Sequence, residues 1–178
     1  WEMPIQYTGV LDEHRACRAD AVVFDVSHLG VVAVSGPGAF DVLQYAFTNY
    51  LNRIEVGKAQ YAHLLDPSDG SVTDDVITWW LADESFLVIP NASNTGPAVD
   101  TLVRIANERA DKACSITDLS DGHRALLAVQ GPKALEKLAT VWPEAAAVGR
   151  FRVATSDWGE VQGIIAGTGY TGEEGVEI

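Results

Sequence analysis

The chain has 178 residues, 47% of them hydrophobic, and this length supports a hydrophobic core in one or two domains. It carries 12 Lys and Arg against 25 Asp and Glu, a formal net charge of -13, which argues against nucleic acid and anionic membrane surfaces as partners. No apolar run approaches the length of a membrane span. The two cysteines, Cys17 and Cys114, lack metal-ligand spacing, so we expect free thiols, a reducing compartment and a cytoplasmic location.

Hydrophobic periodicity predicts a mixture of helices and antiparallel strands, which is an α+β fold. The expected helices span 11–19, 39–49, 95–110 and 134–141. The expected strands span 31–34, 60–65, 72–81, 86–90, 113–119, 126–129 and 159–166. Turn-rich segments separate the three strands between Gln60 and Pro90, which indicates an antiparallel meander. The helix over 95–110 is expected to face the core with Val99, Leu102, Val103 and Ala106.

An internal repeat relates residues 31–39 to residues 126–134. Each copy has four apolar residues, a polar residue, Gly-Pro, and an Ala that opens an amphipathic stretch. This pattern predicts a strand, a tight turn and a helix, with proline in the first helical turn. The repeat therefore favours two related α+β modules over a single sheet, with the join near residues 118–122.

Two adjacent aspartates interrupt the apolar strand predicted at 72–81, where aspartate is unusual. Alternation along the strand places Asp75, Ile77 and Trp79 on one face, a combination typical of a ligand pocket with an apolar lining. The next strand ends just before Asn91, which an antiparallel neighbour would bring close to the carboxylate. A purely structural interpretation, in which Asp75 starts the strand or caps a turn, stays open.

The last ten residues, Gly169–Ile178, combine three glycines with an aromatic ring and a carboxylate. Glycine allows positive φ, so we expect a sharp bend that lets the backbone approach a ligand. Tyr170 would offer a flat face to a heteroaromatic ring, and Glu177 could accept hydrogen bonds from two adjacent N–H donors. A strand that opens at Val176 would have only three residues, so we expect this chain to be a piece of a longer protein.

The spacing of the other polar residues disfavours a catalytic triad, a metal site and a nucleotide-binding loop. Asp25, Ser27 and His28 are too close in sequence to face one another as a catalytic triad, so we expect His28 in the core and Asp25 as a turn acceptor. The four histidines show no metal-ligand spacing, and no metal is expected. Glycine-rich nucleotide-binding motifs are absent.

Several motifs in order resemble one family, the T-protein of the glycine cleavage system, a tetrahydrofolate-dependent aminomethyltransferase. They are Trp1–Tyr7, Asp12-Glu13-His14, Phe24–His28, Gly57–Tyr61, Asp74-Asp75, Ala128–Pro132 and Gly169–Ile178. The family implies a cloverleaf-like protein of three domains with folate in a central channel. By that resemblance, a ferredoxin-like module at 30–121 is inserted in a first, folate-binding domain at 1–29 and 122–178. The third, β-barrel-like domain would lie beyond this chain, and the fragment alone is not expected to turn over.

The resemblance also implies a reaction and a set of site residues. Family members transfer an aminomethyl group from the lipoyl arm of H-protein to tetrahydrofolate, release ammonia and form 5,10-methylenetetrahydrofolate. Matched by position, Asp75 resembles the catalytic carboxylate near the reacting folate nitrogens, and Glu177 resembles the pterin anchor. The remaining pocket positions match Tyr170, Asn91, Tyr61, Leu29, Ile77 and Trp79. Many relatives carry Met in place of Leu29 and Tyr in place of Trp79.

Two other readings share this fold. One is a related folate-dependent demethylase or methyltransferase, or the folate domain of a dimethylglycine or sarcosine oxidoreductase. The other is the non-catalytic folate-binding protein of iron–sulfur cluster maintenance, which carries a cysteine in the motif that matches Gly169–Glu173. The absence of cysteine from Gly169-Tyr170-Thr171-Gly172-Glu173 disfavours this last reading.

Overall fold

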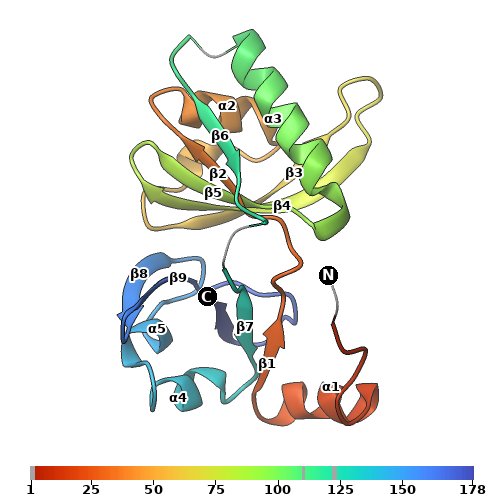
Figure 1. Cartoon of the computed structure of the whole chain (residues 1–178), viewed down its shortest axis with the longest axis vertical. Helices are drawn as coiled ribbons and strands as arrows, with labels where there is room; N and C mark the ends of the chain where they lie inside the picture. The colour runs from red at the N-terminus through yellow and green to blue at the C-terminus, as the bar shows by residue number, and fades with distance from the viewer. Residues whose placement is uncertain (1–2, 110, 122–123) are drawn as a thin grey trace. The chain divides into compact units, whose positions relative to one another are not determined.

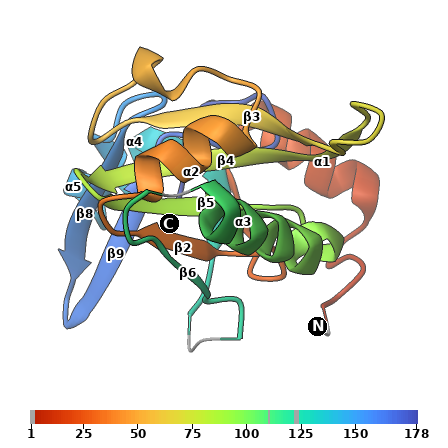
Figure 2. The same ribbon diagram turned by 90° about the horizontal axis from the view of Figure 1, so that it is seen from above.

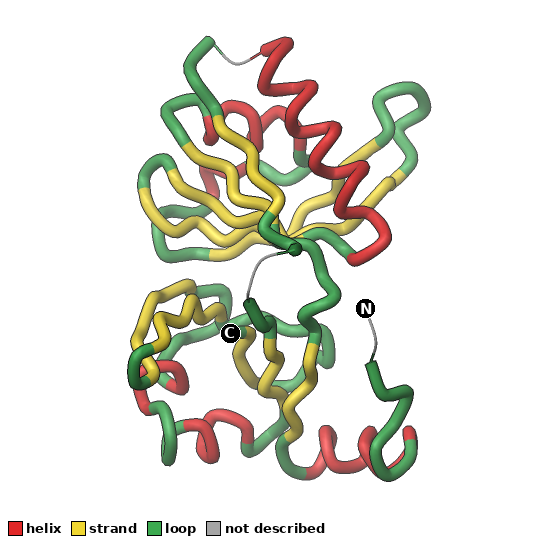
Figure 3. Tube along the Cα trace, viewed as in Figure 1, coloured by secondary structure: helices red, strands yellow, loops and turns green. Residues whose placement is uncertain are grey.

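The computed structural model describes residues 3–109, 111–121 and 124–178, and it shows two compact units (Figure 1). Unit 1 comprises 1–28 and 124–178, and unit 2 comprises 29–123. Both combine strands with helices (Figure 3), and each unit has its own antiparallel five-stranded sheet, so the predicted α+β class with two modules is confirmed. Trp1, Glu2 and Gly122, which belong to the predicted motif and module join, lie outside the described residues. The domain boundaries expected at 30 and 122 stay a prediction.

Unit 2 is formed by the middle of the chain. Its elements are β2 (Val32–Ser35), α2 (Ala39–Ala46), the 3-10 helix η1 (Leu51–Arg53), β3 (Ala59–Leu65), β4 (Val72–Ala82), β5 (Ser85–Ile89), η2 (Ala92–Asn94), α3 (Thr95–Arg109) and β6 (Ser115–Asp118). The sheet order is β3-β4-β5-β2-β6, and the meander of β3, β4 and β5 is as predicted.

The topology of this sheet is ferredoxin-like with one added strand. Both β2 and β4 pair antiparallel with β5, so they run parallel to each other, and α2 lies in the connection between them. Likewise, β5 and β6 both pair antiparallel with β2, so they run parallel to each other, and α3 lies in the connection between them. Two interlocked β-α-β units of this kind define the ferredoxin-like arrangement. Strand β3 extends the sheet at its edge.

Helices α2 and α3 cover one face of this sheet (Figure 2), and the core of unit 2 lies between them and the strands. The helices contribute Val42, Leu43, Ala98, Leu102 and Ile105, and the strands contribute valines and phenylalanine of β2, β4 and β5. The buried stripe of α3 is therefore centred on Ala98, Leu102 and Ile105, whereas Val103 is 39% exposed, so the inward position predicted for Val103 is wrong. Val99 and Ala106 pack at the edge of the core.

Replacement of Leu102 by alanine should destabilise unit 2 by about 3 kcal/mol, because Leu102 is completely buried and its loss leaves a cavity. Urea denaturation of the purified chain measures the change. Val103→Ala, on the next position of α3 and partly exposed, is the matched control and should cost less than about 1 kcal/mol. Equal losses in the two variants would contradict the placement of the core.

Unit 1 forms its sheet from both ends of the chain. Its elements are α1 (Val10–Ala19), β1 (Val22–Asp25), β7 (Leu127–Gln130), α4 (Ala134–Leu138), α5 (Pro143–Ala146), β8 (Val153–Trp158), β9 (Val161–Ala166) and β10 (Gly175–Glu177). The sheet order is β1-β7-β10-β9-β8. Residues of α4, α5 and the turns beside them pack on Ile165 and Val176, which places α4 and α5 on one face of this sheet. Strands β1 and β8 and helix α5 were not predicted.

The internal repeat is visible as the same turn in both units. The amide of Ala39 donates to the carbonyl of Gly36 at 2.9 Å, and the amide of Ala134 donates to the carbonyl of Gly131 at the same distance. Each proline thus occupies the second position of a β-turn that precedes the helix, instead of the first helical turn as predicted. The two predicted helix ends are also too late. Phe47 is extended and bridges to Leu64, which ends α2. After Leu138 the amides of Thr140 and Val141 donate to carbonyls three residues back, so the chain continues in turns instead of α-helix.

Candidate functional site

The helix-free face of the unit 2 sheet carries half of the predicted site residues. On β4, Val76 and Trp80 pack toward the helices, so Asp75, Ile77 and Trp79 point to the opposite face, as alternation predicts. Strand register adds Tyr61 to this face, because Tyr61 pairs directly with Ile77 across β3 and β4. A carboxylate, an aliphatic group and two aromatic rings are therefore neighbours on one sheet surface.

The two adjacent aspartates have different environments. Asp74 is 4% exposed and lies on the helix side, where its carboxylate accepts hydrogen bonds from the Asn91 amide at 3.1 Å and from Nδ2 of Asn91 and of Asn94 at 2.8 Å each. Asp75 is exposed and accepts from Nδ2 of Asn91 at 3.2 Å. Asp74 thus fastens the start of β4 to the segment that leads into α3, while Asp75 keeps acceptor capacity for a ligand. Asn91 contacts both carboxylates, in line with the pairing expected from the sequence.

A shallow pocket of about 300 Å3 lies beside Asp75. Its lining residues come from β3, β4 and the segment after α2: Thr48, Asn49, Tyr61, Ala62, His63 and Asp75. Asn49 donates from Nδ2 to the carbonyl of Tyr61 at 2.9 Å, so this segment follows the outer edge of β3. His63 pairs directly with Asp75 across β3 and β4. Sequence reasoning missed Thr48, Asn49 and His63, although the strand register would have pointed to His63.

Three of the predicted site residues in unit 2, Leu29, Ile77 and Trp79, are buried. Leu29 is 5% exposed and precedes Gly30, whose amide donates to the carbonyl of Pro90 at 3.1 Å. Trp79 is 2% exposed, and within the described residues its indole N–H has no hydrogen-bond partner. Because a buried N–H without a partner is costly, this group is suited to donate to a ligand acceptor.

In unit 1, Glu177 lies at the centre of the sheet and is 1% exposed. Its strand β10 pairs on both sides, so Glu177 stands between Ala128 and Ala166. The hydroxyl of Thr168 donates to Oε2 of Glu177. Burial raises the pKa of Glu177, and the Thr168 hydrogen bond partly opposes this rise. A buried carboxylate without a basic partner among the described residues is suited to bind N–H donors of a ligand.

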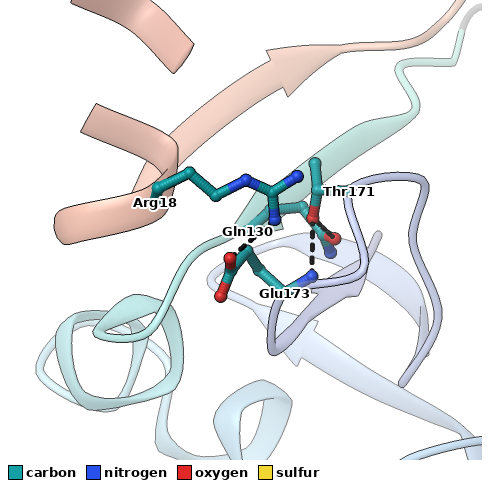
Figure 4. A network of polar contacts seen from close by, with 4 residues as sticks. All are labelled: Arg18, Gln130, Thr171 and Glu173. Atoms are coloured by element: carbon teal, nitrogen blue, oxygen red, sulfur yellow. Dashed lines mark hydrogen bonds and ion pairs between the residues drawn. The ribbon is translucent and has the colours of Figure 1, made fainter. Parts of the chain in front are cut away.

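The segment from Gly169 to Gly175 is held by a network of polar side chains (Figure 4). The Thr171 hydroxyl donates to Oε1 of Gln130 at 2.8 Å and accepts the amide of Glu173 at 3.1 Å. Glu173 in turn pairs with Arg18 of α1 at 2.6 Å. Tyr170, within this segment, is 55% exposed.

The glycines of this segment differ in role from what the sequence suggested. Gly172 has φ of +76°, so the predicted sharp bend is present. A Cβ at Gly169 would lie 2.2 Å from Oε1 of Gln130, and one at Gly175 would lie 2.0 Å from the carbonyl of Val129. The close approach at these two positions is therefore to β7, not to a ligand.

The segment around Asp25 is structural, as the sequence suggested, but in a different way. Oδ1 of Asp25 accepts the amide of Ser27 at 2.9 Å, and hydrogen bonds from Ser27 lower the pKa of Asp25. The buried hydroxyl of Ser27 accepts the amide of Leu126 at 2.8 Å. His28 is exposed, so its predicted place in the core is wrong. Asp25 is confirmed as a turn acceptor.

No three His, Cys, Asp or Glu side chains at 3–109, 111–121 and 124–178 are grouped so that they could hold a metal ion. Over the same ranges, every helix is too short or too polar to cross a bilayer.

Curated relatives match this chain over almost its whole length. It is 43% identical over 178 residues to an aminomethyltransferase of Pelodictyon phaeoclathratiforme, and 41% identical over 182 residues to one of Chlorobaculum parvum. Each alignment covers 99% of this chain and 48% of the relative. The chain therefore spans about half the length of the curated relatives it matches.

Solved structures agree with the fold. The aminomethyltransferase T of the glycine cleavage system from Bartonella henselae superposes with a TM-score of 0.86 at 33% identity, covering 99% of this chain and 46% of that one. A heterotetrameric sarcosine oxidase from Corynebacterium sp. U-96 reaches 0.58 at 18% identity over 94% of this chain and 80% of that one, a likeness of fold alone. The family profile described as GCVT N-terminal domain matches residues 1–178. The chain therefore belongs to the family of the GCVT N-terminal domain, as its motifs indicated.

Proposed function

We propose that this chain is the folate-binding part of an aminomethyltransferase of the glycine cleavage system. The observation that carries the proposal is the buried carboxylate of Glu177, which accepts a hydrogen bond from Thr168 on one oxygen and has no ion-pair partner within the described residues. Such a carboxylate fits the adjacent N–H donors of a pterin ring, which it can bind in a bidentate manner. The family match over 1–178 supports the same substrate class.

In this proposal Glu177 is the pterin anchor and Tyr170 offers its exposed ring to the ligand. In unit 2, Asp75 is the catalytic carboxylate, placed by β4 on the helix-free face and oriented by Asn91 at 3.2 Å. A fixed carboxylate can position the attacking nitrogen and stabilise positive charge that develops there. Tyr61, Ile77, Trp79 and Leu29 form the apolar lining.

In the proposed reaction, tetrahydrofolate accepts a one-carbon unit from the aminomethyl-lipoyl arm of H-protein. Two nitrogens of tetrahydrofolate form bonds to this carbon, its bonds to the amino nitrogen and to the lipoyl sulfur break, and ammonia and dihydrolipoyl H-protein are released. The proposed partner is thus lipoylated H-protein, and the proposed location is the cytoplasm. The residues of this chain bind and orient the folate, and Asp75 controls charge and protons beside its reacting nitrogens.

The test is made on the full-length gene product in two steps. Calorimetric titration with 5-formyltetrahydrofolate measures folate binding, and an assay with aminomethyl-lipoyl H-protein and tetrahydrofolate measures ammonia and 5,10-methylenetetrahydrofolate. We expect both binding and turnover. Absence of folate binding would overturn the proposal.

A mixed outcome separates the remaining alternatives. Folate binding without turnover on H-protein would move the function to a related folate-dependent demethylase or methyltransferase. Oxidative demethylation of dimethylglycine or sarcosine is then the next assay. The sarcosine oxidase likeness, at 18% identity, does not favour this alternative in advance.

A further inference from the structure

The side chain of Gln130 is a buried polar hub in unit 1. It is 1% exposed at the end of β7, between β1 and β10. Its Nε2 donates to the carbonyl of Thr168 at 3.2 Å and to that of Val129 at 3.3 Å, while Oε1 accepts the Thr171 hydroxyl at 2.8 Å. The two carbonyl acceptors at Nε2 and the hydroxyl donor at Oε1 fix the orientation of the amide.

The backbone around Gln130 fits this amide closely. A Cβ at Gly169 would lie 2.2 and 2.3 Å from Oε1 and Nε2 of Gln130, and one at Gly175 would lie 2.7 Å from Nε2. Only glycine leaves room for the amide at these two positions. The glycine spacing of the motif is therefore matched to Gln130, a residue about 40 positions earlier in the chain.

The same amide is connected to the proposed pterin anchor through one residue. Thr168 gives its carbonyl to Gln130 and its hydroxyl to Oε2 of Glu177. Glu177 and Gln130 also share a face of the sheet, because Glu177 pairs with Ala128 and Gly175 pairs with Gln130. Within the described residues no side chain donates to Oε1 of Glu177, which leaves that oxygen to a ligand.

We propose that Gln130 and Thr168 are positioning residues for the folate site. Gln130 fixes the backbone of 168–171, and Thr168 then holds one oxygen of Glu177 so that the carboxylate presents a fixed edge to the pterin N–H donors. This inference rests on the proposed function. It assigns to the Gln130 amide a role in folate affinity and leaves the chemical step to other residues.

The first experiment compares Gln130→Met with Gln162→Met in the full-length protein. Methionine keeps the length of glutamine and removes its three hydrogen bonds, and Gln162 is an exposed residue of β9 in the same sheet. We expect Gln130→Met to raise the Kd of 5-formyltetrahydrofolate about tenfold, with kcat at saturating folate changed by less than about threefold. Gln162→Met should leave both unchanged.

The second experiment compares Thr168→Val with Thr168→Ser. Valine keeps the shape and removes the hydroxyl, whereas serine keeps the donor, so we expect Kd to rise about fivefold in the first and to stay within about twofold in the second. Folate affinity should fall at acid pH as Glu177 becomes protonated. Because the Thr168 hydroxyl lowers the pKa of Glu177, this fall should occur at a higher pH in the valine variant than in the wild-type protein. We assign this pH effect to Glu177 for two reasons. Its strand partners Ala128 and Ala166 do not titrate, and the charged residues of the network, Arg18 and Glu173, are paired with each other.

The outcomes separate this inference from the proposed function. Binding by the wild-type protein with unchanged Kd in Gln130→Met and Thr168→Val overturns the positioning role alone. No binding by the wild-type protein overturns the proposed function and this inference with it. Should Gln130→Met fail to fold, the threonine pair decides, since a merely structural role would not move the pH profile or be rescued by serine.

Discussion

Replacement of Glu177 by glutamine is expected to weaken binding of 5-formyltetrahydrofolate about 100-fold, which corresponds to about 2.8 kcal/mol. A carboxylate accepts two N–H donors at once, and each charge-assisted bond contributes about twice as much as a neutral one. The glutamine amide offers one acceptor and turns an NH2 group against the other donor. Titration calorimetry on the full-length protein measures the loss. A Kd within about threefold of the wild-type value would remove Glu177 from the site.

The same variant should be more stable than the wild-type protein at neutral pH when no ligand is bound. Burial raises the pKa of Glu177, so the folded state favours the protonated carboxyl. The stabilising contribution of this group is therefore complete below its unfolded-chain pKa and is lost as pH rises through the raised folded pKa. Glutamine does not titrate, so the advantage of Glu177→Gln should grow from about pH 4 upward and then become constant.

Urea denaturation at about pH 4 and about pH 8 measures this difference. Glu160→Gln, which removes an exposed carboxylate from the turn between β8 and β9, is the control and should show no such growth. A gain in stability combined with a loss of affinity is the pattern expected of a buried binding carboxylate. Loss of stability in Glu177→Gln at the higher pH would contradict it.

The parts of the fold that the sequence predicted are those with strong local patterns. The meander β3 to β5 and helix α3 follow from strand alternation and helical periodicity. Asp75 and Asn91 approach each other because β4 and β5 pair antiparallel, which brings the start of β4 beside the end of β5. Strand β1 was missed because it has only four residues, three of them apolar in a row, which is too short a run to show alternation. Helix α5 was missed because four residues carry too little periodicity.

The contacts that organise the C-terminal motif could not be predicted from local pattern. Gln130 and Thr168 are 38 positions apart, and no periodicity relates an amide at a strand end to a threonine before a glycine. The repeat did mark Gln130, because its polar position matches Ser35 in the first copy. The glycines at 169 and 175 were noticed, but their contact with β7 depends on the pairing of β10, which only the structure shows.

Asp75→Asn is expected to reduce turnover on aminomethyl-lipoyl H-protein about 1000-fold, a rise in the barrier of about 4 kcal/mol. The amide keeps an oxygen for the Asn91 hydrogen bond, so the geometry of the strand is preserved and only the negative charge is lost. Since Asp75 is exposed, folding stability should change by less than about 0.5 kcal/mol. Folate affinity should change by less than about threefold, because the charge acts on the chemical step.

The neighbouring aspartate gives the matched comparison. Asp74 is buried and accepts three hydrogen bonds from Asn91 and Asn94, so Asp74→Asn turns an NH2 group toward donors and should cost about 2 kcal/mol of stability. Turnover and urea denaturation, measured on both variants, assign the roles. Strand β4 places the carboxylate of Asp74 on the helix side of the sheet and that of Asp75 on the helix-free face. Asp75→Asn should therefore lose turnover, and Asp74→Asn should lose folding stability. The reverse pattern would place the chemistry at Asp74.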